Sequence, residues 1–129
     1  MQKEKLKDSE QKSKLDMKRR AYDFALCIIK LVDSLPVGGS SNILGSQLIR
    51  SATSIGANII EAQAASSRKD FKNFLSYALK SANETKFWLG LLRDSNKKPA
   101  SEINPLLIEV KELANILASS LITLKNKKV

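Results

Sequence analysis

The sequence predicts an all-α protein, specifically an antiparallel up-down four-helix bundle, and three observations support this fold class. Four segments carry apolar residues at helical spacing. Short loops that contain clusters of glycine, proline, serine and asparagine separate these segments. No segment alternates apolar and polar residues as a half-buried strand does. Helices of roughly 20 to 25 residues joined by short loops bury their apolar stripes most simply as an antiparallel bundle.

The first predicted helix covers about residues 15–35 and ends before Pro36 and the Gly38-Gly39 pair. We expect its buried face to consist of Leu15, Tyr22, Ala25, Ile29 and Val32. Cys27 lies among Phe24, Ile28 and Leu31 in a helical pattern, so we expect it to be a small buried side chain. Residues 1–14 have too few apolar positions to join the core. They are therefore predicted to form a flexible basic extension that is disordered or partly helical.

The second predicted helix begins after Ser40 and Ser41, either of which can cap its first turn, and continues to about Ala65. Ser67 and Asp70 have the spacing of a capping box, which predicts a third helix that ends near Asp94. Its expected buried stripe is Phe71, Leu75, Ala78, Ala82 and Leu89.

The fourth predicted helix begins near Ser101 or Asn104 and ends near Lys125, with Pro105 in its first turn, where a missing amide proton costs least. Its expected buried side is Leu106, Val110, Leu113, Leu117 and Leu121. The bundle therefore covers residues 15–125, and residues 126–129 form a basic tail.

The second helix carries a polar stripe beside its apolar face. Taking about 100° per residue, the apolar face consists of Leu44, Leu48, Ala52, Ile55, Ile59 and Ala62. The stripe consists of Gln47, Arg50, Ser54, Asn58 and Glu61. One interpretation is a polar network with Glu84 of the third helix that fixes helix register. The other is a small site for a ligand or for the backbone of a partner.

Most of the formal charge of +9 lies at the two ends of the chain. Residues 1–20 hold eight basic and four acidic residues, and residues 125–129 add three lysines. Basic ends attract phosphate backbones without reading sequence, although they also simply aid solubility. The candidate nucleic-acid contacts are Lys18, Arg19, Arg20, Arg68, Lys69, Lys80, Lys125, Lys127 and Lys128.

Four apolar residues project away from the expected core and predict an oligomer interface: Ile49, Ile60, Phe87 and Leu91. Lys69 and Lys80 are expected on the same outward side as Phe87. Repeated in a homo-oligomer, these lysines would form a basic rim.

The sequence argues against an enzyme. The chain has no histidine, which removes the commonest general base and histidine-based metal sites, and we expect no cofactor and no metal. Residues 37–41 lack the lysine and spacing of a phosphate-binding loop. A weaker alternative is catalysis by Glu61, Glu84 and Arg50. The longest apolar run, residues 24–29, is too short to cross a membrane, and we expect a cytoplasmic protein without a signal peptide.

Several motifs together resemble a known family. They lie at residues 47–50, 54–61, 71–78, 81–85 and 87–89. The sequence resembles the four-helix-bundle proteins encoded by intervening sequences of bacterial large-subunit (23S) ribosomal RNA genes, over roughly residues 15–125. It departs from them at Ala62, where the family often has glycine.

The family is also similar to accessory subunits of diversity-generating retroelements. That similarity implies a basic homopentamer that engages a reverse transcriptase and nucleic acid. The leading functional hypothesis is therefore a non-enzymatic oligomeric module that binds nucleic acid, or a nucleic-acid-processing partner, without reading bases. The alternative is a protein-interaction scaffold with no affinity for nucleic acid.

Overall fold

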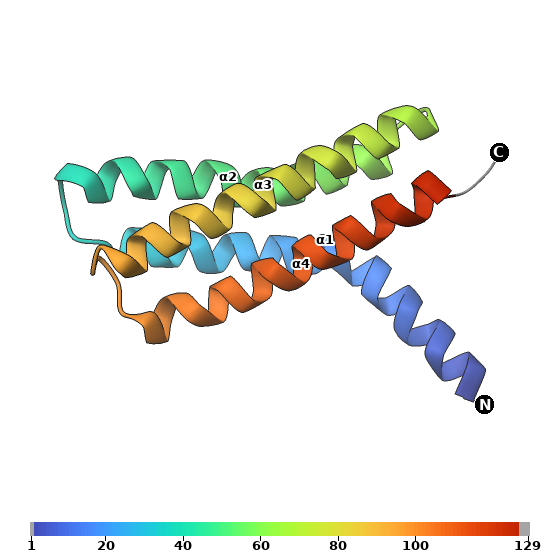
Figure 1. Cartoon of the computed structure of the whole chain (residues 1–129), viewed down its shortest axis with the longest axis horizontal. Helices are drawn as coiled ribbons and strands as arrows, with labels where there is room; N and C mark the ends of the chain where they lie inside the picture. Colours follow the sequence, from blue (N-terminus) through green and yellow to red (C-terminus); the bar gives the residue numbers. More distant parts are fainter. Residues whose placement is uncertain (1, 127–129) are drawn as a thin grey trace.

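The protein is a bundle of four long helices. The computed structural model describes the backbone of residues 2–126 and the side chains of residues 17–126. The helices are α1 (Gln2–Asp33), α2 (Gly39–Gln63), α3 (Arg68–Asp94) and α4 (Ala100–Asn126). Successive helices reverse direction, so the α1–α2 and α3–α4 loops lie at one end and the α2–α3 loop lies at the other (Figure 1). The predicted all-α up-down bundle is confirmed.

The first half of α1 extends past the bundle. The helix begins at Gln2, so the backbone of residues 2–14 continues α1. This part (dark blue in Figure 1) points away from the other three helices. That residues 1–14 are flexible stays a prediction. In the basic tail, Asn126 is the last residue of α4 and residues 127–129 lie outside the described part of the chain.

The core lies between the four helices and is almost entirely aliphatic. The expected faces of α2, α3 and α4 are confirmed, because most of the residues assigned to them are buried and the others pack against the core. The largest fully buried side chains are Ile28, Leu48, Ile55, Ile59, Leu89, Leu92, Ile103, Val110, Leu113 and Leu117. A continuous core of this kind provides the main stabilisation of the fold.

The buried face predicted for α1 is wrong except for Val32, which is partly buried and packs against the core. The residues that enter the core are Met17, Ala21, Phe24, Ile28 and Leu31. Tyr22 is 63% exposed and Ile29 is 38% exposed, so much of the predicted face lies on the outside. Cys27 is also exposed, contrary to expectation, because it lies about 100° around the helix from Ile28. The side chain of Leu15 lies outside the described residues.

The predicted helix ends are partly right. Ser67 caps α3, because its hydroxyl accepts a hydrogen bond of 3.1 Å from the amide of Asp70. The caps predicted at Ser40 and Ser41 are wrong, since α2 begins before both serines, at Gly39, and its cap residue is Gly38, which has a φ of 93°. A left-handed φ of this kind favours glycine and lets the chain turn sharply into α2.

Pro105 lies one turn further into α4 than expected. The helix begins at Ala100, so Pro105 is in its second turn, where proline lacks the amide proton for a bond to the carbonyl of Ser101. Both residues are exposed, so water can satisfy that carbonyl.

Candidate functional site

The polar stripe of α2 faces α3, and its first part forms an exposed ion pair. Arg50 donates from Nη2 to Oε1 of Glu84 across the two helices, at 2.7 Å. The same guanidinium donates from Nε and Nη2 to Oε1 of Gln47, at 3.1 and 3.0 Å. The Arg50 side chain is 60% exposed and that of Glu84 is 38% exposed. Water therefore screens this pair, which orients the two helices more than it stabilises them.

The second part of the stripe is a chain of short hydrogen bonds. Asn58 donates from Nδ2 to the carbonyl oxygen and the hydroxyl of Ser54, at 2.8 and 3.0 Å. The hydroxyl of Ser81 on α3 donates to that of Ser54, at 2.9 Å. These bonds satisfy polar groups at a helix contact, so this geometry favours the structural interpretation of the stripe.

One buried contact in this seam was missed by sequence reasoning. Thr85 donates from Oγ1 to the hydroxyl of Ser51 at 2.9 Å, and neither residue is exposed. Ser51 lies on the edge of the apolar face of α2 and not within the stripe. The sequence signal that could have predicted this contact is the presence of two hydroxyl residues, Ser51 and Thr85, at core positions of neighbouring helices.

Glu61 lies apart from the rest of the stripe. It is exposed, and among the described residues it makes no hydrogen bond or ion pair. It is eleven residues from Arg50, which corresponds to about 17 Å along the helix axis. Glu61 and Glu84 therefore do not form an acid and base pair beside Arg50. Within the described side chains, no group of three acidic or cysteine residues is arranged to hold a metal ion.

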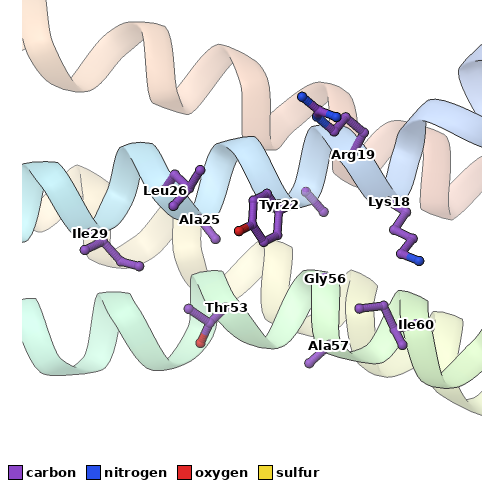
Figure 2. A pocket seen from close by; sticks show the side chains of 11 residues that line it. Lys18, Arg19, Tyr22, Ala25, Leu26, Ile29, Thr53, Gly56, Ala57 and Ile60 are labelled. Atoms are coloured by element: carbon purple, nitrogen blue, oxygen red, sulfur yellow. The ribbon is translucent and has the colours of Figure 1, made fainter.

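A groove lies on the other side of α2, between α2 and α1. Its volume is about 590 Å³, and it is lined mostly by carbon atoms. The lining residues are Lys18, Arg19, Ala21, Tyr22, Ala25, Leu26, Ile29, Thr53, Gly56, Ala57 and Ile60. In Figure 2, Tyr22 lies between the two helices at the centre of the groove, and Lys18 lies beside Ile60 at one end. Three of the α1 residues that were expected to be buried, Tyr22, Ala25 and Ile29, line this groove.

Small residues allow the two helices to approach closely behind the groove. A Cβ atom added to Gly56 would lie 3.5 Å from Cβ of Ala21, which is ordinary van der Waals contact. Larger side chains at either position would separate α1 from α2. The short side chains of Ala25 and Ala57 leave space between Tyr22 and Ile60, which explains why a groove remains there.

The four residues proposed as an oligomer interface do not form one surface. Ile60 is 47% exposed and lines the groove. Phe87 and Leu91 are 59% and 37% exposed and lie one turn apart on the outside of α3. Ile49 is only partly exposed and packs against the core.

Arg20 forms ion pairs with two carboxylates of α4. Its Nη2 lies 2.5 Å from Oε1 of Glu109 and 2.6 Å from Oε2 of Glu112. The hydrogen bond with Glu109 raises the pKa of the Arg20 guanidinium above its usual value, although partial burial opposes this. Arg20 therefore joins α1 to α4, the two neighbouring helices that meet least closely, and is a poor candidate for contacting phosphate.

Replacing Arg20 with methionine should lower the free energy of unfolding by about 1 kcal/mol, because two carboxylates lose their cation at a partly exposed site. Arg19→Met is the matched control, since the Arg19 side chain is 79% exposed and, among the described side chains, its one ion pair is with Asp23 at 3.5 Å. Urea denaturation of both variants checks this result. Equal losses would show that the cluster with α4 contributes nothing specific.

Most of the other basic candidates come together at one end of the bundle. Arg68 and Lys69 begin α3, and Lys125 lies in the last turn of α4. Arg68 donates from Nη2 to the carbonyl oxygen of Leu124 at 3.3 Å, so these two helix ends are in contact. Lys18 lies beside the last turns of α2 at the same end (Figures 1 and 2).

Two further observations complete this set of basic residues. Lys72, one turn after Lys69, is also exposed and was missing from the candidates drawn from the sequence, although it follows Arg68 and Lys69 closely. Lys80 lies further along α3, with Nζ 5.7 Å from the ring centre of Tyr77. Lys127 and Lys128 lie outside the described residues.

No described helix is both long and apolar enough to cross a membrane.

The comparisons with known proteins agree with this geometry. The family model described as 23S rRNA-intervening sequence protein matches residues 13–119. The chain belongs to this family. It is also similar to a Bacteroides thetaiotaomicron protein of unknown function from the S23 ribosomal protein family, whose crystal structure is known. The two sequences are 37% identical over 81% of this chain and 97% of the other, with a TM-score of 0.77. No curated protein matches the chain.

Proposed function

We propose that this member of the intervening sequence family is a non-enzymatic, oligomeric helical-bundle module that binds nucleic acid. It binds through basic surfaces and does not read bases. A nucleic-acid-processing protein such as a reverse transcriptase is a further proposed partner, by the resemblance to retroelement accessory subunits. The number of subunits, five by the same resemblance, stays a prediction.

The observation that supports nucleic-acid binding is the gathering of basic side chains at one end of the bundle. Residues from three different helices contribute to this basic end, which we define as Lys18, Arg19, Arg68, Lys69, Lys72 and Lys125. Lys69, Lys72 and Lys125 are exposed and make no ion pair with another described residue. Lysines without an acidic partner attract phosphate more strongly than paired ones, so this end is the preferred contact.

The start of α1 and the end of α4 lie on the same side of the bundle as the basic end (Figure 1). In the sequence, residues 1–20 and 125–129 carry most of the positive charge of the chain. An array of lysines and arginines binds the phosphate backbone through the release of counterions, and this binding carries no base information. Aromatic residues are sparse in the chain, which also disfavours base stacking as the main mode.

A titration of generic structured RNA and duplex DNA tests this proposal by fluorescence anisotropy. We expect affinity to fall steeply between low and near-physiological salt. A chain that lacks residues 1–14 and 126–129 should bind more weakly, with a shallower salt dependence, because fewer counterions are released. Retention of some affinity by this shorter chain would show that the basic end of the bundle contributes directly.

A protein-interaction scaffold is the second candidate function, and the apolar groove between α1 and α2 favours it. Exposed apolar surface of this kind usually marks a binding surface. If neither RNA nor duplex DNA binds the intact chain near physiological salt, nucleic-acid binding is rejected and the scaffold becomes the better account.

A further inference from the structure

A strip of exposed basic and aromatic side chains lies along α3 and begins at the basic end. Lys69 and Phe87 are separated by five whole turns of the helix, or about 27 Å, so both lie on the same side of it. Lys80 lies close to the line that joins them, and Tyr77 lies on its flank. All four side chains are exposed, and the rings of Tyr77 and Phe87 belong to residues that are 51% and 59% exposed. We call these four residues the α3 strip.

Each aromatic ring of the α3 strip packs against a second ring. Tyr77 packs edge-on against Phe74, with 6.3 Å between ring centres. Phe87 packs edge-on against Trp88, with 5.0 Å between ring centres. Phe74 and Trp88 are partly buried against the core, so they restrain the two exposed rings. A restrained ring loses little entropy when a flat group stacks on it.

Lys80 lies between the two exposed rings along the helix axis. Its Nζ is 5.7 Å from the ring centre of Tyr77, which is within the range of a cation–π contact. Lys80 makes no ion pair with another described side chain. An uncompensated ammonium beside an aromatic ring is suited to a nucleotide, because the base can stack while the phosphate meets the cation.

The carboxylates near the α3 strip do not cancel its positive charge. The helix carries six basic and three acidic residues. Glu84 pairs with Arg50 at 2.7 Å, and Asp94 pairs with the arginine before it at 2.9 Å. The exposed carboxylates of Asp70, in the first turn of α3, and Glu61, in the last turns of α2, lie near the basic end, where basic residues outnumber them. The strip as a whole therefore attracts phosphate.

We propose that the α3 strip binds an unpaired strand of nucleic acid, with bases stacked on Tyr77 and Phe87 and phosphates at Lys69 and Lys80. This inference rests on the proposed function and adds a substrate class to it, single-stranded nucleic acid. The basic end remains the main contact, and stacking adds to it. The two rings are about 15 Å apart along the axis, so they contact different bases of one strand. Every base has an aromatic face, so this contact adds affinity without reading sequence.

Two substitutions in the full chain test the proposal, Tyr77→Ala and Phe87→Ala. The probe for fluorescence anisotropy is single-stranded oligothymidylate, which forms no base pairs of its own. Each substitution should weaken binding of this strand roughly tenfold. Binding of duplex DNA should change by less than about twofold, because paired bases are not free to stack on the rings. Ile122→Ala on α4, at a residue that is 60% exposed, is the matched control and should bind both probes as the intact chain does.

Tyr77→Phe separates stacking from a role of the phenol hydroxyl. It keeps the ring and should bind oligothymidylate as tightly as the intact chain, so a tenfold loss here would contradict stacking. Circular dichroism and light scattering check that each variant keeps the helix content and mass of the intact chain.

The two probes also separate this inference from the proposed function. Unchanged binding of oligothymidylate by the two alanine variants, or equal losses for oligothymidylate and duplex DNA, would overturn the role of the α3 strip and leave binding at the basic end in place. If the intact chain binds neither probe near physiological salt, the proposed function is wrong and this inference is wrong with it.

Discussion

Replacing Leu89 with alanine is expected to lower the free energy of unfolding by about 2 to 5 kcal/mol. Leu89 lies in the last third of α3 and is completely buried between the helices. Truncating it removes favourable burial of apolar surface and leaves a cavity that the surrounding side chains fill only in part. Because small domains are stable by about 5 to 15 kcal/mol, this single change removes a large share of the total stability.

Urea denaturation followed by circular dichroism measures this loss. Ile122→Ala is a suitable control, because Ile122 is an aliphatic residue on α4 that is 60% exposed, and its truncation should change stability by less than about 0.5 kcal/mol. Similar losses in the two variants would contradict the assignment of Leu89 to the core.

Reversing the charge of two lysines at the basic end should reduce the affinity for duplex DNA by roughly tenfold near physiological salt. The variant is Lys69→Glu combined with Lys125→Glu, from α3 and α4. Both lysines are exposed and have no ion-pair partner among the described residues, so the bundle should fold normally. Loss of two phosphate contacts should also lower the salt dependence of log K by about 2.

Lys30→Glu combined with Lys111→Glu is the matched control for this variant. It changes the net charge by the same amount, and both lysines are exposed away from the basic end. This control should bind nearly as well as the intact chain. Equal losses in the two double variants would show that net charge alone drives binding, without a preferred surface.

The fold was predictable because three of the four helices have one clear apolar face. Leu48, Ile55 and Ile59 recur at helical spacing on α2, and all three are buried as predicted. Ser67 and its spacing to Asp70 predicted the start of α3. These signals are local, so they can be read from neighbouring residues without knowing how the helices pack.

The orientation of α1 was not predictable in the same way. This helix has apolar residues on two sides, with Phe24 and Ile28 on one and Tyr22 and Leu26 on the other. Periodicity identifies both stripes but cannot choose between them, since the choice depends on the faces that α2 and α4 offer. The error concealed the groove, because Tyr22, Ala25 and Ile29, which line it, were assigned to the core.

The sequence predicted which kinds of residue belong to the candidate sites. It did not predict which of these residues lie close together in space. The stripe on α2 was identified correctly as polar, and the pairing of Arg50 with Glu84 was proposed from the sequence. The distance of Glu61 from that pair depends on position along the helix. The gathering of Lys18, Lys69 and Lys125 depends on which helix ends meet, which only the packed bundle determines.

Lysine footprinting of the intact chain, with and without nucleic acid, tests the central claim most directly. Acetylation of each exposed lysine is measured by mass spectrometry near physiological salt, in the presence of structured RNA or duplex DNA. We predict protection of Lys69, Lys72 and Lys125 at the basic end, while Lys30 and Lys111 react as they do in the free protein. Uniform protection of all five lysines, or no protection at the basic end under conditions in which the nucleic acid is bound, would contradict the proposed interface.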